Sequence, residues 1–241
     1  MAALTRELTS PSAPRPLESG IVPCPDIRPD LLSYRLLSPR NPGPADIPLL
    51  GEAYRCWRSV WQQTLQELDH LDTVPSDDFS RQDEIGALFH EWECLGLTSY
   101  RWLDLSNPID RDDSYFHIWS EEARAAAAMG GPRVCICGNL TVAAPWRRAK
   151  GVPVKEVLLS LAVERFLESP ADALLGTPRN DRGMNALGYR LGFQPLSRGV
   201  IHHGVEVDLV AFFRASCTRA PSEPSVEAAV QALRPRLGEG A

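Results

Sequence analysis

The stretch that decides the fold begins with Val134-Cys-Ile-Cys-Gly-Asn-Leu-Thr-Val142 and continues through Pro145-Trp-Arg-Arg-Ala-Lys-Gly-Val-Pro153. The first part is apolar and predicts a buried strand. The second part is a basic loop, and the apolar periodicity from Val154 to Leu167 predicts a helix directly after it. A short strand over residues 172–175 and a helix ending in Tyr189-Arg-Leu-Gly-Phe193 follow. Strand and helix therefore alternate in this half of the chain.

The basic loop predicts a phosphate-binding site. Arg147, Arg148 and Lys150 supply positive charge just before a helix begins. The free N–H groups of Gly151 and Val152 and the positive end of the helix dipole add to that attraction. The alternative is a solvated basic loop that holds no ligand.

The order of these parts resembles the GCN5-related N-acyltransferase (GNAT) superfamily. In that family the fourth strand, a pyrophosphate loop and the next helix hold the pantetheine and phosphates of an acyl carrier. Ser33-Tyr-Arg-Leu-Leu-Ser38 and the amphipathic run after Asp46 are similar to the family's first strand and first helix. The likeness covers residues 31 to 214. It implies an α/β fold: a single GNAT-like domain with a mixed, mostly antiparallel sheet flanked by helices.

The resemblance also implies an acyl donor, either acyl-CoA or an acyl-carrier protein, and no metal. Asn180 is an expected pantetheine contact, with an N-cap role as the alternative. Pro153 stands where the family pattern Arg/Gln-x-x-Gly-x-Gly/Ala has its second small residue, and proline lacks an N–H. That departure leaves room for a carrier protein with a single phosphate. The remaining donor-binding residues implied by the resemblance are Asn139, Leu140, Thr141, Val142, Arg147, Arg148, Lys150, Gly151 and Val152.

The length and composition of the chain indicate a single domain with one hydrophobic core. Its 241 residues are 44% apolar, and a formal net charge of -6 gives no field to attract nucleic acid. Six scattered cysteines, with no Cys-x-x-Cys pair and no histidine at a metal-ligand spacing, favour reduced thiols in a cytoplasmic protein. No apolar run approaches the length of a membrane span. The oligomeric state is left open.

Three parts are predicted along the chain. Residues 1–30 are a Pro-rich arm expected to be disordered, because they cannot bury enough apolar surface to offset chain entropy. Residues 31–214 form the acyltransferase-like domain, and residues 215–241 a tail with a short helix. Residues 104–133 are too long for a simple hairpin connection. An insertion at this place resembles the branch of N-acyl amino acid synthases and acyl-homoserine-lactone synthases.

The insertion carries Tyr115, Phe116 and Trp119, which we expect to line a tunnel for a fatty acyl chain. Packing of the same side chains as a lid on the core is the alternative. Glu84, at a strand start, and His117, in the insertion, are the predicted general bases that remove a proton from the amine. For either residue a solvent-exposed role is the alternative.

Tyr189 is the predicted acid for the leaving thiolate. The family often places a tyrosine five residues before the phenylalanine of Leu-Gly-Phe, and that position is Gly188 here. Tyr189 is one residue later and about 100° around the helix, so simple core packing is the alternative. No cysteine has an evident histidine companion, which favours direct attack by the amine over a covalent acyl-enzyme.

The sequence therefore predicts an N-acyltransferase that moves an acyl group, with a fatty chain expected from the insertion, from a thioester carrier to the amine of a small molecule such as an amino acid. One rival hypothesis makes the acceptor a lysine-like amine on a peptide or protein. A second rival is a non-catalytic GNAT-like module that binds acyl carriers. Turnover separates them, because a binding module would not release free thiol.

Overall fold

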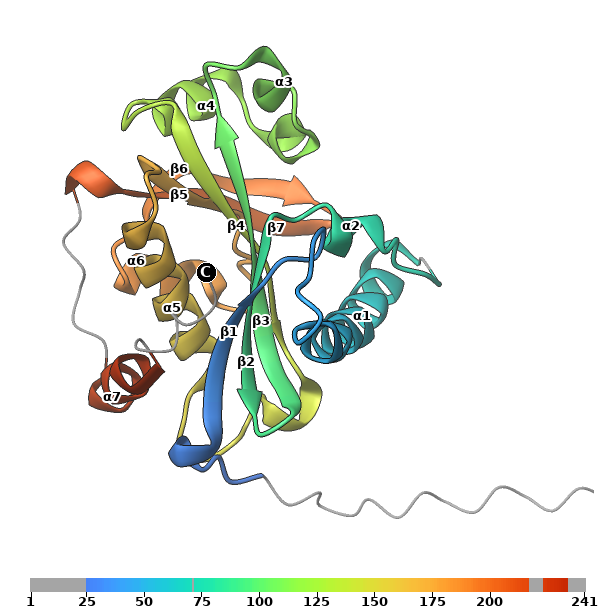
Figure 1. Ribbon diagram of the computed structural model, residues 1–241. Coiled ribbons are helices and arrows are strands. Elements are labelled where there is room, and N and C mark those ends of the chain that lie inside the picture. Colours follow the sequence, from blue (N-terminus) through green and yellow to red (C-terminus); the bar gives the residue numbers. More distant parts are fainter. Residues whose placement is uncertain (1–24, 71, 217–222, 234–241) are drawn as a thin grey trace, which may run out of the picture.

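The computed structural model describes residues 25–70, 72–216 and 223–233. Within these residues one sheet of seven strands runs in the order β1-β2-β3-β4-β5-β7-β6 (Figure 1). The strands are β1 (Leu32–Leu37), β2 (Glu84–His90), β3 (Glu93–Asp104), β4 (Arg133–Val142), β5 (Ala173–Gly176), β6 (Gln194–His202) and β7 (Val205–Phe213). Only β4 and β5 pair in parallel. The predicted mixed, mostly antiparallel sheet is confirmed.

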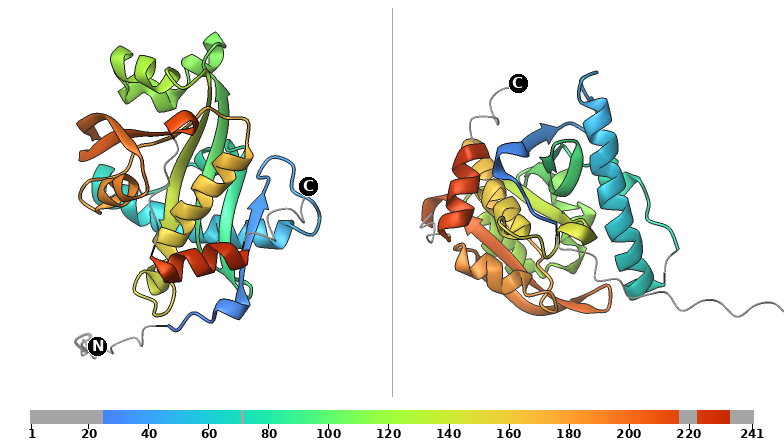
Figure 2. Two further views of the ribbon diagram at one scale, coloured as in Figure 1. Left: turned by 90° about the vertical axis from the view of Figure 1, so that its left-hand side faces the viewer. Right: turned by 90° about the horizontal axis from the view of Figure 1, so that it is seen from below.

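Helices cover both faces of this sheet (Figures 1 and 2). One face carries α1 (Ile47–Asp69) and α2 (Asp77–Ser80), and the other carries α5 (Val154–Glu168), α6 (Met184–Arg190) and α7 (Pro224–Leu233). The amphipathic pattern explains α1, since Ala53, Trp57 and Leu65 are buried while most of its polar side chains face outward. The predicted C-terminal helix is present as α7.

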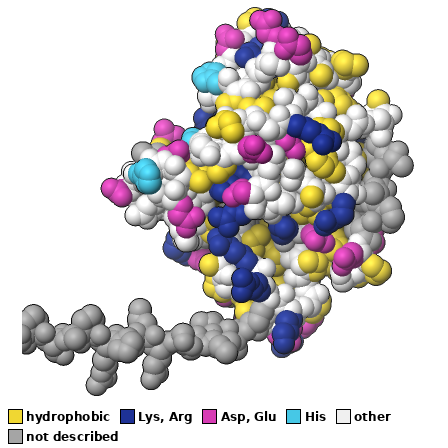
Figure 3. Space-filling view, turned by 180° about the vertical axis from the view of Figure 1, so that it is seen from behind, with side chains coloured by type: hydrophobic (Ala, Val, Ile, Leu, Met, Phe, Trp, Pro, Cys, Tyr) yellow, Lys and Arg dark blue, Asp and Glu magenta, His cyan; other side chains and the backbone are white. Residues whose placement is uncertain are grey.

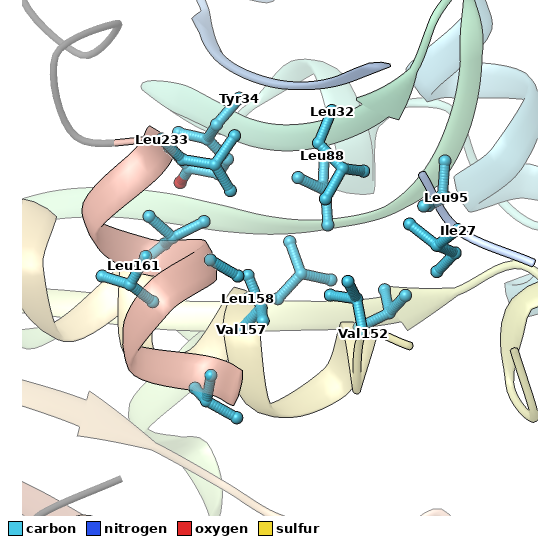
Figure 4. Packing of buried hydrophobic residues seen from close by; sticks show 14 of the residues in the cluster. Ile27, Leu32, Tyr34, Leu88, Leu95, Val152, Val157, Leu158, Leu161 and Leu233 are labelled. Carbon is cyan, nitrogen blue, oxygen red and sulfur yellow. The ribbon is translucent and has the colours of Figure 1, made fainter. Parts of the chain in front are cut away.

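The α5 face has a continuous apolar core that reaches both ends of the described chain. Figure 4 shows Leu233 of α7 beside Tyr34 and Leu161, and Ile27 at the opposite end of the same cluster near Val152. Ile27 is only 3% exposed, so ordered structure begins ahead of residue 31. Residues 1–24 of the predicted arm lie outside the described residues.

The insertion forms a small layer over the first half of β4 and the neighbouring strands β5 and β7. It contains α3 (Pro108–Arg111), a 3-10 helix at Ser114–Ile118 and α4 (Glu121–Ala128). Each of these helices begins with a capping side chain, because Asn107, Asp113 and Ser120 accept from backbone N–H groups two or three residues later. The layer is therefore ordered by local signals as well as by burial.

The sheet splits between β4 and β5. The two strands pair only from Val134 opposite Ala173 to Ile136 opposite Leu175. Beyond that point β4 continues along β3 as far as Val142, whereas β5 ends at Gly176 against β7. The second half of β4 therefore has a strand neighbour on one side only, and its other edge faces a gap in the sheet.

Among the described residues, no helix combines the length and apolar character that crossing a bilayer requires. The same residues contain no group of three histidine, cysteine or acidic side chains placed to hold a metal ion.

Candidate functional site

A cleft of about 670 Å³ occupies the split between β4 and β5. This volume lies within the range of roughly 300–1,000 Å³ typical of small-molecule sites. Its walls come from the second half of β4, the loop and first turns of α5, the segment after β5, α6, and the C-terminal half of α1. The cleft therefore joins segments that are far apart in the sequence.

The β4 wall contains a β-bulge at the predicted donor strand. Leu97 pairs with Thr141 and Ser99 with Gly138, so Asn139 and Leu140 both stand opposite Thr98. Asn139 has a left-handed φ of 53°, and an extra residue of this kind is left out of the strand ladder. The bulge thereby releases backbone groups from the ladder, and Asn139 and Leu140 both line the cleft.

Side chains fix the bulge from both sides. The Trp61 indole of α1 donates to Thr141 Oγ1 at 2.9 Å, and the Thr141 hydroxyl donates to the Asn139 carbonyl at 2.7 Å. On the other side, Asn139 Nδ2 donates to Ser99 Oγ at 3.1 Å. The predicted polar residue within the apolar strand thus stabilises an irregular backbone. Sequence alone gave no sign of the Trp61 contact.

The predicted phosphate-binding end lies where the basic loop enters α5. Gly151 adopts a φ of 91°, and Pro153 occupies the N-cap position. The first N–H groups of a helix have no intrahelical partner, and Val154 and Lys155, which supply these groups in α5, both line the cleft. The start of α5 therefore presents N–H donors and the positive end of the helix dipole to the cleft.

The predicted loop residues divide into two groups. Arg147 and Val152 line the cleft, whereas Arg148, Lys150 and Gly151 do not. The Lys150 N–H donates to the carbonyl of Pro25 at 3.2 Å, because the segment after the arm packs along the loop. The Lys150 amide is therefore engaged within the protein.

Despite the net negative charge, cations gather at the cleft. Arg147, Lys155, Arg179 and Arg182 all contribute to its lining. Figure 3 shows Lys and Arg side chains following one another down the face opposite to that of Figure 1. This distribution favours an anionic ligand.

A buried carboxylate, Asp208 of β7, organises the wall opposite β4. It is 3% exposed and accepts from the side chains of Asn180 at 3.1 Å, Asn185 at 3.0 Å and Tyr189 at 2.5 Å. The Gly199 N–H also donates to it, at 2.9 Å. Burial raises the pKa of Asp208, but these hydrogen bonds outweigh burial and lower the pKa to about 2. Sequence reasoning missed this residue, although an acid between Val207 and Leu209 of an apolar strand was an available signal.

Asp208 determines where Asn180 and Tyr189 point. Asn180 binds this carboxylate and does not line the cleft. Burial, with the hydrogen bond to Asp208, raises the pKa of Tyr189 to about 12. Gly188, where the family's tyrosine would be, lines the cleft, and Tyr189 does not. The structure thus commits the Tyr189 hydroxyl to Asp208.

The two predicted bases lie away from the cleft. Glu84 accepts two hydrogen bonds from Arg165, at 2.8 and 2.7 Å, and these bonds to the carboxylate raise the pKa of Arg165. His117 is exposed on the insertion. Neither residue lines the cleft, so their roles as bases stay predictions without support from the geometry.

The three aromatic residues of the insertion pack together and onto the sheet. Phe116 and Trp119 are buried with Val134, Ile136 and the neighbouring strands in one cluster, and Tyr115 packs against it. None of the three lines the cleft. Within the described chain, the Trp119 indole N–H and Tyr115 hydroxyl are buried without a hydrogen-bond partner, and burial raises the pKa of Tyr115. This placement matches the lid alternative.

Similar solved structures show the same fold. An arylalkylamine N-acetyltransferase-like 5b from mosquito has a TM-score of 0.56 and 12% identity, over 76% of this chain and 99% of that chain. The AHL synthase LasI has a TM-score of 0.54 and 12% identity, over 80% and 98%. FeeM, an N-acyl amino acid synthase from uncultured soil microbes, has a TM-score of 0.52 and 14% identity, over 77% and 91%.

The chain has the GNAT fold. The fold predicted from the resemblance is thus confirmed. No protein-family model matches the sequence, and no curated protein matches it. The function is therefore inferred from the fold and from the geometry of the cleft.

Proposed function

We propose that this protein is an N-acyltransferase that moves an acyl group from a thioester carrier to the amine of a small molecule. The observation that carries the proposal is the cleft at the split between β4 and β5. It joins a strand bulge at Asn139 to a helix start that can hold an anion, at Val154. One elongated donor with a phosphate at one end and a thioester at the other would span both.

The reaction follows from the cleft's two ends. Bulge backbone N–H groups beside Asn139 would stabilise the oxyanion that forms when the amine attacks the thioester carbonyl. The C–N bond forms, the C–S bond breaks, and the thiolate leaves with the electron pair. Cys137 lines the cleft, but burial raises its thiol pKa to about 12. A thiol of this kind is a poor nucleophile at neutral pH, which supports direct attack.

For the donor, the loop geometry supports a carrier with a single phosphate. Pro153 has no N–H, and the Lys150 N–H is engaged with Pro25. We therefore favour an acyl-carrier protein, with its phosphopantetheine arm in the cleft, over acyl-CoA. The buried apolar part of the cleft wall, which includes Leu159, Phe193 and Val210, supports a fatty acyl chain as the transferred group.

Thiol release tests this proposal. The protein is mixed with acyl-carrier protein or acyl-CoA and a panel of primary amines, while free thiol is followed by a colorimetric reagent and the amide by mass spectrometry. Amine-dependent thiol release is expected, faster with the carrier protein. Faster reaction with acyl-CoA would overturn the donor assignment, and a lysine-containing peptide as the sole acceptor would favour the peptide rival.

A second candidate function has its own support. Position 188, where the family has its tyrosine, is a glycine and supplies no acid to the cleft. The Tyr189 hydroxyl donates to Asp208 instead. These features favour a non-catalytic module that binds acyl carriers. Tight binding of an acyl carrier by calorimetry, with no thiol released in the presence of any amine, would establish that function instead.

A further inference from the structure

The cleft contains two carboxylates among its described lining residues, Glu67 of α1 and Glu156 of α5. Glu156 lies in the first turn of α5, beside the anion-binding end, and pairs with Arg190 at 3.5 Å. Glu67 lies on the opposite wall, where α1 closes the cleft. An acceptor amine that enters the cleft away from the donor's phosphate would therefore contact Glu67 and not Glu156.

Helix geometry places Glu67 within a small molecule's length of the bulge. Trp61, Thr64 and Glu67 line the cleft from one side of α1, and Trp61 is fixed to Thr141 beside the bulge. Six residues of helix separate the backbones of Trp61 and Glu67 by about 9 Å. Helical side chains lean toward the N-terminus of their helix, so the Glu67 carboxylate leans back toward the bulge.

A guanidinium faces this carboxylate. Arg182 Nη2 lies 3.8 Å from Glu67 Oε2, with the two side chains 58% and 52% exposed. The Arg182 Nε lies 3.5 Å from Asp181. Both separations exceed good charge-assisted hydrogen bonds, whereas Arg179 binds the same Asp181 at 3.0 and 2.7 Å. Arg182 is therefore held loosely by its neighbours, and an incoming carboxylate can replace them.

We propose that Glu67 and Arg182 together recognise a free α-amino acid as the acceptor, an inference that rests on the proposed acyl transfer. Arg182 binds the α-carboxylate, and Glu67 binds the α-ammonium group. Opposite charges side by side match the two charges of an amino acid, whereas a plain amine or the side chain of a peptide lysine offers only one.

Glu67 also accepts a proton during the reaction. Glu67 takes one proton from the ammonium group, and the neutral nitrogen then attacks the thioester carbonyl carbon. As the C–N bond forms, the C–S bond breaks and the sulfur keeps the electron pair. The second proton lost by the nitrogen neutralises the thiolate, which leaves an amide, a free thiol and protonated Glu67.

Replacing Glu67 or Arg182 should leave the position of α1 unchanged. The next acid on α1 is Asp69, and its Oδ2 lies 2.6 Å from Nδ1 of His203 in the turn between β6 and β7. This contact joins α1 to the far side of the split independently of Glu67. The Glu52–Arg55 ion pair on α1, which does not line the cleft, offers a matched control.

The experiment compares three acceptors that share one side chain: the free amino acid, its carboxamide, and the amine without a carboxyl group. For each acceptor, kcat/KM is measured with the wild type and with Arg182→Ala, Arg182→Lys, Glu67→Gln and Arg55→Ala. We expect wild-type protein to prefer the amino acid over the other two by about 10- to 100-fold, as one charge-assisted contact supplies.

Arg182→Ala should abolish this preference by slowing the amino acid alone, and Arg182→Lys should restore part of it. Glu67→Gln should slow all three acceptors, because no carboxylate then takes the proton from the ammonium group. Arg55→Ala should match the wild type. Amide formation from all three acceptors without preference, or a preference that persists in Arg182→Ala, would overturn this inference and leave acyl transfer standing. An absence of thiol release with every acceptor would overturn both.

Discussion

The two halves of β4 lie in the same strand but have opposite surroundings. The first half pairs with β3 and β5, and its Val134 and Ile136 are covered by the aromatic cluster of the insertion. The second half pairs with β3 only, contains the bulge at Asn139 and lines the cleft. Pairing on both edges produces a closed core, whereas loss of one neighbour opens space for a ligand. Four predictions test this division, in order of decreasing effect.

The largest effect is expected in the first half. Trp119→Ala should lower the free energy of unfolding by about 3–5 kcal/mol, because a buried aromatic is lost and a cavity remains. The order in which acyl chain lengths react should stay unchanged, since Trp119 does not line the cleft. Trp119→Phe is the control and should cost less, because it removes an N–H without a described partner. Urea melts and kcat/KM across a chain-length series decide between a lid and a tunnel.

Asp208→Asn tests the wall that faces the second half of β4. It should lower the free energy of unfolding near neutral pH by about 2–3 kcal/mol, since a buried acceptor of four hydrogen bonds is lost. The folded pKa of Asp208 is depressed to about 2. Its contribution is therefore complete above the ordinary carboxyl pKa and is lost as pH falls through about 2. The difference between variant and wild type should shrink between pH 4 and pH 2, and a constant difference in acid titrations would refute the linkage.

Charge removal tests the phosphate end of the second half. Arg147→Ala with Lys155→Ala should weaken donor binding by about 1.5–3 kcal/mol, because both side chains line the cleft. Arg148→Ala with Lys150→Ala removes the same charge from residues outside the lining and should have a smaller effect. Calorimetric titration with acyl donors at low and high salt measures both. Equal losses in the two double variants would show that only the general field of the loop matters.

The smallest effects are expected at the bulge. Asn139→Gly should change the free energy of unfolding by less than about 1 kcal/mol, because glycine adopts a left-handed φ easily while the bond to Ser99 is lost. Asn139→Val should cost about 1–3 kcal/mol, since a β-branched residue is strained there. Thermal melts compare the two. A more stable Asn139→Val would mean that the bulge straightens, and turnover should then fall.

Much of the fold was predictable because its signals are local. The alternation of strand and helix from Val134 to Phe193 follows from apolar periodicity, and α5 begins at Val154, as predicted. Part of the site was equally predictable: Asn139, Leu140 and Val142 line the cleft together with Arg147 and Val152. In these cases the side chain's position follows from its own strand, loop or helix start.

The direction of single side chains was less predictable. Glu84 marks a strand start, as expected, but it faces Arg165 on α5. Tyr189 is one residue from Gly188, and that rotation about the helix turns its hydroxyl to Asp208 on β7. Each outcome depends on a partner from a distant element, and a local pattern carries no information about that partner.

Local signals predicted the order of the elements, the basic loop before α5 and the polar interruption at Asn139, because each depends on the preferences of neighbouring residues. Three features arise only in the folded molecule: the separation of β4 from β5 after Ile136, the approach of Glu67 to Arg182 across the split, and the packing of the insertion's aromatic residues in the core. All three depend on long-range packing. Contacts between residues distant in sequence are set by the whole core at once, so they become visible only when the chain has folded.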